Sequence, residues 1–415
     1  MTALLLLLLL FLPAGARAFE PETAGYAGVH DLGTKSAAAL GWNPALLSAD
    51  RGFRVSFELP SCGAALANNS FTSKYWNDHF ASDQYWSEAT KNDILRQTPR
   101  DGLGGDAELS VPALGFTYDR FATRIAVRSA GKVRVPDALT SVFLFGNDFN
   151  RSYDIGDLTA ESMTMVDVGL GFGYRFEQER IPDLHFGAGF HYYRGLYLAT
   201  VAEREGQLTF TDSDFSGSAM MHSVTAQRGD GVGFDLGSYA VLSKQWEVGL
   251  AFRQLGARIA WQVDENTLVT FYKDSVGIIA DSLDDSSYVK RALHYSDTSY
   301  SGGGIETRLP AIIQMNARYN ARPNWTVLGD VQIFTQETAW GKAGVQAGIA
   351  SEYRVWSFLP LYAGLSAGGP WRVQLGVGAG LRFRNYELDL GGTWINGFFY
   401  GARGIGFGLS QRLKF

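Results

Sequence analysis

The side chains in this sequence that could do chemistry are its histidines, serines and acids. His185 and His191 are six residues apart, and Tyr193 follows them. On a β-strand the three would share one face, but six residues of strand span about 20 Å. Ligands of one metal ion lie about 2 Å from it, so this spacing excludes a shared metal. We expect no metal site and no cofactor.

A nucleophilic centre needs Ser, His and an acid at one depth of the fold, and no spacing in the sequence brings such a set together. The segment 264–307 is acidic, but its carboxylates lack the regular spacing of a Ca²⁺ loop. The single cysteine, Cys62, excludes an intrachain disulfide framework. Because no spacing in the sequence indicates a nucleophilic centre, we predict that the protein is not an enzyme.

The composition limits the classes of protein that remain. The chain has 415 residues, 46% hydrophobic, 13% aromatic and 19% charged, with 49 glycines and a net charge of −6. This content is too apolar for disorder and not basic enough for a nucleic-acid binder. The mean hydropathy of −0.07 fits a soluble protein or a membrane β-barrel, in which outward apolar residues alternate with inward polar ones.

The first eighteen residues are typical of an export signal. Leu4–Leu12 is a short apolar run, and the small residues after it end in Ala-x-Ala at Ala18. We predict a signal peptide, residues 1–18, cleaved after Ala18. Beyond it, no run of about 18 apolar residues could cross a membrane as a helix.

Long alternating segments predict membrane strands. In 371–384 the odd positions, from Trp371 to Phe383, are apolar, whereas the even positions are glycine, glutamine or arginine. The same alternation recurs at 166–176, 184–193, 246–253 and 386–394. Many apolar rows begin or end in an aromatic residue, as a girdle at the membrane interface requires. Several of these segments are also longer than the usual 5–6 residues of a soluble strand.

We therefore predict an all-β fold: a transmembrane, antiparallel, up-and-down β-barrel over 52–415, with about 14 strands, an N-terminal plug and short loop helices. The predicted strands are 52–67, 110–119, 121–130, 162–176, 183–200, 230–242, 245–263, 308–320, 323–336, 343–355, 357–367, 371–384, 385–397 and 402–415. Sixteen strands are the alternative, because 52–67 could be a hairpin and 197–228 could extend one outside.

The connections support this assignment. The long ones all fall at one end, which is the external end in bacterial barrels: 68–109, 131–161, 201–229 and 264–307. The short turns fall at the other end. We expect short surface helices within 70–97 and a capped helix at 137–145.

The inward rows carry charges of both signs. The predicted lumen-facing polar residues are Arg54, Arg124, Arg128, Asp167, Arg175, Glu247, Arg253, Arg318, Asp330, Arg372, Arg382, Glu387 and Asp389. A polar conduit is one interpretation. We favour a structural network of paired charges, because the signs are interleaved and no ring of a single sign occurs.

The last strand ends in phenylalanine. Phe407, Leu409, Leu413 and Phe415 share its apolar face. This ending resembles the sorting signal of bacterial outer-membrane barrels, so we expect an outer-membrane location, with the barrel-assembly machinery and outer-membrane lipid as partners and no nucleic acid.

Residues 19–51 lack strand alternation and are rich in glycine and alanine. A barrel of about fourteen strands has a lumen wider than side chains can fill. We expect 19–51 to fold into this lumen as a hatch, or plug; a periplasmic tail is the alternative. Within it, Asn43-Pro44-Ala45 resembles the Asn-Pro-Ala motif in the hatch of FadL-type long-chain fatty-acid transporters.

A second motif resembles the same family. Leu309-Pro310-Ala311, followed by Tyr319, Trp325 and Asp330, is similar to a hairpin of FadL-type proteins. The resemblance covers the two ends of the chain and the architecture. The middle, especially 68–109 and 201–307, looks more like uncharacterised FadL-like outer-membrane proteins.

The resemblance implies passive uptake of hydrophobic small molecules, with a ligand that enters from outside and leaves through the wall after the hatch shifts. It assigns only Asn43, Pro44 and Ala45, as hatch positions. The alternative function is a non-transport barrel that serves as a scaffold or partner of a secretion or surface-attachment system. A cavity under the loops that leads to a kink in the wall would favour transport.

Overall fold

The computed structural model describes residues 19–34, 36–49, 52–81, 85–146, 151–154, 156, 158–176, 183–210, 215–273, 294–300, 302–335, 343–369 and 371–415. The predicted signal peptide and the centre of the acidic loop lie outside the described residues. No helix among these residues is long and apolar enough to cross a membrane.

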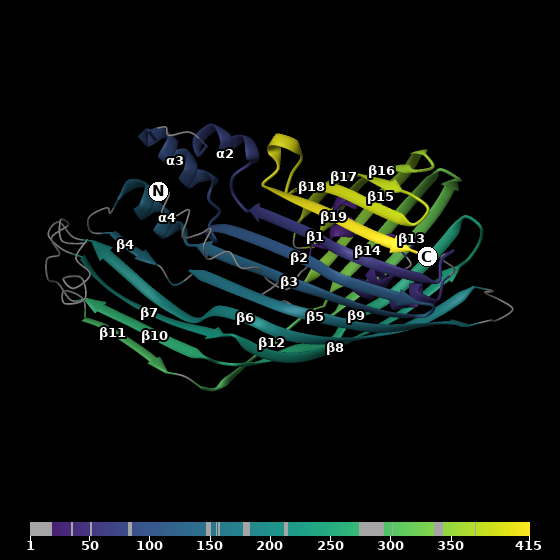
Figure 1. The fold of residues 1–415 in the computed structure, drawn as a ribbon. Helices are drawn as coiled ribbons and strands as arrows, with labels where there is room; N and C mark the ends of the chain where they lie inside the picture. The colour runs from purple at the N-terminus through teal and green to yellow at the C-terminus, as the bar shows by residue number, and fades with distance from the viewer. Residues whose placement is uncertain are drawn as a thin grey trace.

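Fourteen strands of the described chain close into a barrel (Figure 1). They are β1 (Val55–Asn68), β2 (Leu103–Tyr118), β3 (Phe121–Val135), β5 (Thr159–Phe176), β6 (Leu184–Phe210), β8 (Arg228–Val241), β9 (Trp246–Gln262), β13 (Ile312–Arg322), β14 (Trp325–Phe334), β15 (Gly344–Trp356), β16 (Leu359–Gly368), β17 (Val373–Arg382), β18 (Tyr386–Ile395) and β19 (Gly404–Lys414). Neighbours in this order pair antiparallel, and β1 pairs with β19 to close the wall. The predicted fold class and the strand number of fourteen are confirmed.

The sixteen-strand alternative is wrong. Residues 55–68 form one continuous strand, β1, with a bulge between Leu59 and Cys62 instead of a hairpin. The extension of a hairpin outside at 197–228 is present: β6 continues to Phe210 and returns as β7 (Phe215–Ala226), but this hairpin adds no strand to the barrel wall.

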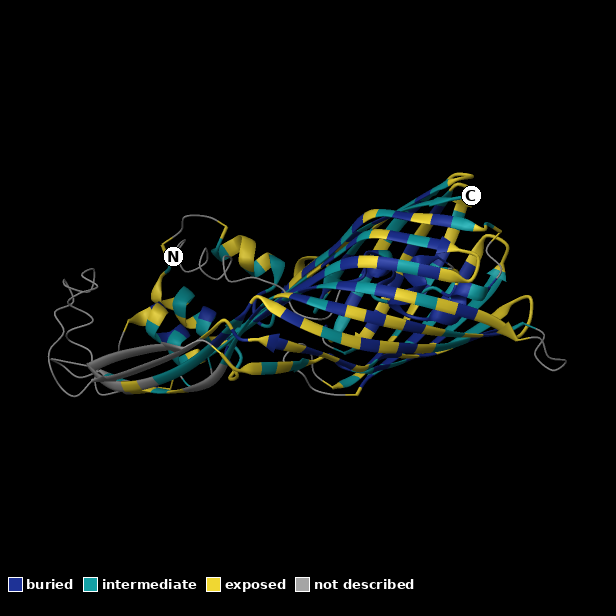
Figure 2. Cartoon of the chain, turned by 60° about the horizontal axis from the view of Figure 1, so that its bottom comes forward, coloured by how far each residue is buried: buried dark blue, intermediate teal, exposed yellow. Residues whose placement is uncertain are grey.

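Outward apolar side chains explain why these sequences form strands of a membrane wall. The rows of exposed and buried residues alternate over the barrel (Figure 2). Phe172 and Phe252, for example, are exposed on the outside of the wall. Gly173 and Ala251, which adjoin them in the chain, are buried on its inner side. In water such a surface would aggregate, but in lipid it is the stable arrangement because the closed wall pairs every strand edge.

At one end the sheet extends beyond the barrel (Figure 1). The extension comprises β4 (Arg151–Asp154), β7, β10 (Glu265–Lys273), β11 (His294–Tyr300) and β12 (Gly304–Arg308). β4 and β7 pair with the far half of β6, and β10 lies between β7 and β11. The strands therefore reach further into 68–109, 131–161, 201–229 and 264–307 than predicted, because strand pairing can continue past the membrane.

Three short helices lie at the same end: α2 (Ser73–His79), α3 (Glu88–Gln97) and α4 (Asp137–Phe145). Thr72 and Ser87 cap the first two by accepting hydrogen bonds from Tyr75 N and Thr90 N. Their predicted presence in 70–97 and 137–145 agrees with the structure. We call this the loop end and the opposite end, which carries the short turns and the C-terminus, the turn end.

Candidate functional site

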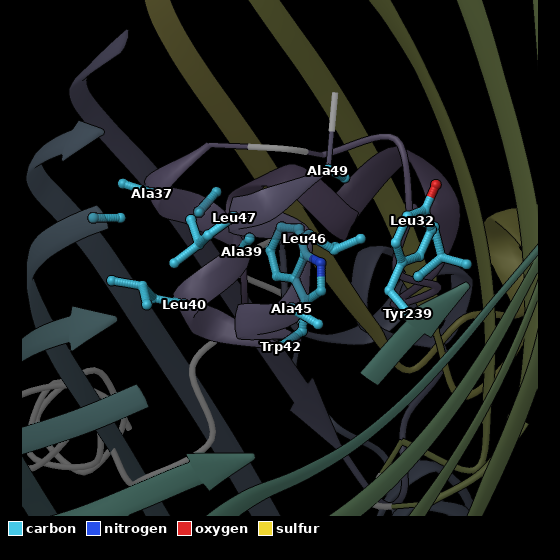
Figure 3. Close-up of a cluster of buried hydrophobic side chains, with 12 residues drawn as sticks. Leu32, Ala37, Ala39, Leu40, Trp42, Ala45, Leu46, Leu47, Ala49 and Tyr239 are labelled. Atoms are coloured by element: carbon cyan, nitrogen blue, oxygen red, sulfur yellow. The ribbon is translucent and has the colours of Figure 1, made fainter. Parts of the chain in front are cut away.

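The described N-terminal residues, 19–34 and 36–49, lie inside the barrel (Figure 3). They form three short 3₁₀ helices, η1 (Pro21–Tyr26), η2 (Ala37–Gly41) and η3 (Pro44–Ser48). Their apolar side chains, with Leu40, Trp42 and Leu46 almost completely buried, pack against Ala122 and Tyr239 of the wall. We call residues 19–49 the lumen segment.

Local sequence explains the folding of the lumen segment. Asn43 caps η3, because its side chain accepts a hydrogen bond from Ala45 N, and Pro44 occupies the first helical turn, where no amide donor is needed. The Asn43 amide also donates to Ser238 O of β8 at 3.0 Å. The Asn-Pro-Ala motif therefore begins η3 and attaches it to the wall.

Wall glycines make room for the backbone of the lumen segment. A Cβ atom at Gly391 would lie 2.2 Å from Gly25 N, and one at Gly364 would lie 2.3 Å from Tyr26 O. Any larger residue would collide with this backbone. The glycine-rich inward rows seen in the sequence thus mark where the segment contacts the wall.

The predicted charges Arg124, Arg128 and Asp167 lie together, next to two acids of the lumen segment. Arg124 pairs with Glu22 at 3.1 Å and Glu20 at 3.5 Å, and with Glu58 of β1 at 3.6 Å. Arg128 joins Glu20 to Asp167 at 3.3 and 3.2 Å. We call Glu20, Glu22, Glu58 and Arg124 the acid cluster.

The network continues across the wall. His191 contacts Asp167 through Nδ1 at 2.8 Å and Asp235 through Nε2 at 3.4 Å. Asp235 accepts a hydrogen bond from Gln254 N on β9. His185 and His191 do not share a partner in these contacts, and no group of three or more potential metal ligands occurs among the described residues.

Asp330 and Arg318 hold the middle of the lumen segment. The Asp330 carboxylate accepts a hydrogen bond from His30 N at 2.9 Å, and it also lies 2.8 Å from Nδ1 of the His30 ring. Arg318 binds Asp31 at 2.7 Å and lies 3.7 Å from Glu247. Arg253 donates to Gln314, which in turn donates to Asp330.

Arg382, Glu387 and Asp389 form a separate group toward the turn end. Arg382 pairs with Asp389 at 2.7 Å and lies 3.9 Å from Glu387, which also binds Arg412 and Lys414.

Three of the residues predicted to face the lumen are exposed instead of buried in the network. Arg372 is exposed in a turn with φ +50, because β17 begins only at Val373; its neighbour Trp371 is buried instead. Arg54 is exposed before β1, with its guanidinium 5.2 Å from the Tyr118 ring centre. Arg175 lies at the end of β5, its side chain 46% exposed, and pairs with Asp183 at 2.9 Å. All three lie at strand ends, where alternation does not determine burial.

The structure does bring together one Ser, His and Asp. Ser48 Oγ lies 2.8 Å from His185 Nδ1, and His185 Nε2 lies 3.0 Å from Asp183 Oδ1. The ring is turned so that Nδ1, not Nε2, meets the serine, the reverse of the serine-protease arrangement. Neither of the two cavities described below is lined by Ser48. This chain of contacts attaches the end of the lumen segment to β6.

The apolar face of β19 points outward as the sequence indicates. Phe407 and Phe415 are exposed, and Leu409 and Leu413 are half-buried. Phe415 also extends the pairing with β1, because its N–H donates to Val55 O at 2.8 Å.

The lumen segment separates two cavities. The outer cavity, of about 90 Å³, lies toward the loop end between Phe19, Trp371, Phe334 and Ile312 and several polar side chains, Glu20, Arg253 and Gln254 among them. The inner cavity, of about 330 Å³, lies toward the turn end, and its lining includes both signs of charge.

The wall is irregular beside the outer cavity. Gln254 and Gly256 of β9 have φ of +56 and +64, and β9 carries extra residues relative to β8 on both sides of the Phe234–Leu255 pair. On the other side of β9, the strand partner is interrupted between Arg308 and Ile312. We call Gln254–Ala257 and Leu309–Ala311 the wall break.

Side-chain polarity inverts at the wall break. Before it, apolar Leu250 and Phe252 face outward, whereas beyond it Ile259 and Trp261 are buried and Arg258 is exposed outside. The wall break therefore lies at the edge of the lipid-facing zone. Sequence reasoning missed it, although the apolar positions of 245–263 change there from even to odd.

Burial affects the acids of the lumen segment unequally. It raises the pKa of Glu22 to about 7; Arg124 opposes this shift, and the carboxylates of Glu20 and Glu58 add to it. For Glu20, burial has the same effect, but Arg128 and Arg124 outweigh it and hold the pKa below its ordinary value.

A closed wall of fourteen strands around its own N-terminal segment defines the class of this protein: a plugged β-barrel with a lipid-facing exterior. Residues 44–228 match a family model described as a family of unknown function (DUF5723). No curated protein matches the sequence.

Solved structures are similar over nearly the whole chain. The Ralstonia pickettii toluene transporter TbuX is 14% identical, with 96% of this chain and 98% of that chain covered and a TM-score of 0.51. A Pseudomonas aeruginosa FadL homologue is 14% identical, with coverage of 97% and 99% and a TM-score of 0.53. The TodX deltaS2S3 mutant, a monoaromatic hydrocarbon channel, is 14% identical, with coverage of 96% and 99% and a TM-score of 0.58. The chain thus has the fold of FadL-type outer-membrane channels, and the predicted resemblance is confirmed for the fold.

Proposed function

We propose that this protein is an outer-membrane channel that takes up hydrophobic small molecules and releases them sideways through the wall break. The observation that carries the proposal is that the outer cavity is lined by Gln254 and Ile312, residues on the two strands that border the break. A molecule in this cavity is therefore next to the wall break.

The chemistry of the cavity supports an apolar cargo with a polar end. Phe19, Trp371 and Phe334 supply apolar surface, and Arg253 and Gln254 each have a buried polar atom without a hydrogen-bond partner among the described residues. A ligand that presents an oxygen or amide could bind these atoms while its apolar part contacts the rings.

The position of the break supports lateral release. Exposed ion pairs, Arg194–Asp230 and Arg258–Glu306, lie on the outer surface beyond it, and the outward-facing side chains of Leu236 and Phe252 lie before it. A molecule that leaves through the wall break enters the membrane at the edge of its lipid-facing zone. It does not have to cross the polar half of the lumen at the turn end.

We further propose export by cleavage after Ala18, assembly by the barrel-assembly machinery through the C-terminal strand, and contact of the outer face with outer-membrane lipid. The lumen segment, with Asn43, Pro44 and Ala45, acts as the hatch in this proposal. The named neighbours, two of them a toluene transporter and a monoaromatic hydrocarbon channel, support the cargo class by likeness of fold.

Uptake of labelled toluene and oleate by cells that express the full chain tests the proposal. Deleting Gln254 and Gly256 removes the two extra residues of β9, so uptake should fall at least tenfold while the barrel still assembles. Gly256→Asn is the matched control, because asparagine tolerates positive φ, a Cβ at Gly256 meets nothing within 4 Å, and Gly256 lines neither cavity; it should keep wild-type uptake. If wild-type cells take up neither compound faster than cells without the protein, the proposal is wrong.

The scaffold function remains a second proposal because of one observation: β7, β10 and β11 extend the sheet beyond the barrel. A scaffold would need this extension and not the break. Removing residues 206–218 should then abolish partner attachment and leave uptake unchanged.

A further inference from the structure

The two cavities lie on either side of η1. Thr23 lines both cavities, Glu20 lines the outer cavity, and Glu22 lines the inner cavity. At this point, one turn of 3₁₀ helix separates the half of the lumen that opens toward the loops from the half that opens toward the turns.

Polar groups line both sides of this turn. The inner cavity has charged side chains over most of its wall, and the outer cavity includes Arg128, Arg253 and several glutamines near Glu20. If the first turn of η1 moved aside, the joined space would be wet. Such a path suits water and small hydrated ions, and it does not suit the apolar cargo proposed above.

The acid cluster holds the turn in place. Arg124 binds Glu20 and Glu22 from opposite sides of the barrier, and Glu58 approaches the same guanidinium. The Thr23 hydroxyl donates to Glu20 O at 3.0 Å and closes the turn itself. Three carboxylates thus share Arg124, and one oxygen each of Glu22 and Glu58 is buried without a hydrogen-bond partner among the described residues.

We propose that the lumen contains a second route, a polar passage for water and small ions, and that a proton on Glu22 keeps it closed. When Glu22 is protonated, Arg124 has two carboxylates to neutralise. When Glu22 releases its proton to the inner cavity, its carboxylate joins those of Glu20 and Glu58 at Arg124. Arg128, which lies 3.3 Å from Glu20, is shared with Asp167, so the three carboxylates still repel one another, and hydration of the turn relieves the repulsion.

The direction of the pH effect follows from the Glu22 carboxyl. Its pKa of about 7 in the closed state exceeds the ordinary value of 4.5 that it regains when hydrated. A group with a raised pKa stabilises the closed state below its ordinary pKa, and that stabilisation is lost as the pH rises through 7. Each unit of difference between the two pKa values changes the equilibrium between the closed and the open state about tenfold. The fraction of barrels with an open passage should therefore rise roughly a hundredfold between pH 5 and pH 8.

The other charged groups that face the inner cavity contribute little to the change in its net charge with pH, because they lie in pairs or groups of both signs. They come from the lumen segment, β9, β13, β15, β17, β18 and β19: Asp31, Glu247, Arg318, Glu352, Arg354, Arg382, Glu387, Asp389, Arg412 and Lys414. Tyr26 donates to Glu352 at 3.1 Å, and Tyr362 of β16 donates to Asp389.

Conductance of the full barrel in planar bilayers, in KCl between pH 5 and pH 8, tests this inference. The wild type should open with rising pH, with a midpoint near 7. Glu22→Gln should stay closed throughout, because it cannot ionise. Glu88→Gln, on the exposed face of α3, is the matched control and should behave as the wild type.

A second variant protects the test against a folding defect. Glu58→Gln removes one repelling carboxylate, while its amide oxygen can still accept the hydrogen bond that Ser36 Oγ donates at 2.7 Å. Its midpoint should move to lower pH, whereas general damage would open the lumen at every pH. A wild-type conductance that does not change with pH, or a Glu22→Gln barrel that keeps the wild-type response, would overturn the inference. Uptake of toluene and oleate is independent of this result, so the two proposals can fail separately.

Discussion

At the scale of single residues, buried charge is the main feature of this lumen. Arg124 is almost completely buried among three carboxylates, and Arg128, Asp167 and His191 extend the same network. Buried ions are tolerated only when they are paired. The residues predicted from inward charge therefore act, in most cases, by holding the lumen segment and by neutralising one another.

Arg124→Gln should destabilise the lumen segment strongly. The change leaves Glu20, Glu22 and Glu58 without their shared cation, and breaking a buried pair costs about 3–5 kcal/mol. Arg194→Gln is the control, because Arg194 and Asp230 form a pair with side chains 42% and 56% exposed, and exposed pairs contribute about 0–1 kcal/mol. Urea titration of the purified barrel, read by proteolysis within residues 19–49, measures the difference. Equal midpoints for the two variants would show that the cluster does not hold the segment.

At the scale of elements, the strands could be predicted and their partners inside the lumen could not. Alternation is a local property, and lipid outside the wall keeps it regular, so the predicted strands 371–384 and 162–176 agree with β17 and β5 to within three residues at each end. The lumen contacts join residues far apart in the chain; His30 and Asp330, for example, are 300 residues apart. No local pattern encodes such a pair. The wall break was missed because a bulge changes the phase of alternation without interrupting the apolar content.

Wall glycines provide the second prediction, which is the first at the scale of elements. Gly364→Ala with Gly391→Ala places two methyl groups against the backbone of the lumen segment, 2.3 and 2.2 Å from its atoms. The segment must move, so its protease sensitivity should rise several-fold while the wall stays closed. Gly329→Ala is the matched control, because a Cβ there meets nothing within 4 Å; it should be neutral or slightly stabilising. Unchanged protection in the double variant would mean that the segment does not rest on these strands.

The C-terminal strand, β19, gives a third prediction. Deleting Phe415 removes its backbone bond to Val55 and its ring contact with Phe57, whose ring centre is 6.4 Å away. We expect several-fold less assembled barrel in the outer membrane, scored by heat-modifiable mobility on gels. Phe415→Trp keeps an aromatic end and should assemble normally. Normal assembly of the deleted chain would contradict a sorting role for this residue.

At the scale of the whole molecule, the wall and the lumen segment are separable structures. The barrel closes through backbone pairing from β1 to β19, and none of its strand pairings uses a residue of 19–49. The segment, by contrast, depends on the wall, because its 3₁₀ helices are too short to be stable alone and complete the burial of their side chains against wall residues such as Ala122 and Tyr239. The wall should therefore form without the segment, but the segment should not fold without the wall.

Deleting residues 21–49 tests this separation and keeps the predicted cleavage site. The deleted chain should still give a heat-modifiable barrel, and its conductance should be at least tenfold above that of the full chain and independent of pH, because both the barrier and Glu22 are gone. A deletion of residues 85–98, which include α3, is the control. It shortens the loop end and leaves the lumen segment in place, so the conductance should stay at the level of the full chain. A deleted barrel that stays closed would show that wall side chains alone seal the lumen, and the hatch role of Asn43, Pro44 and Ala45 would then have to be given up.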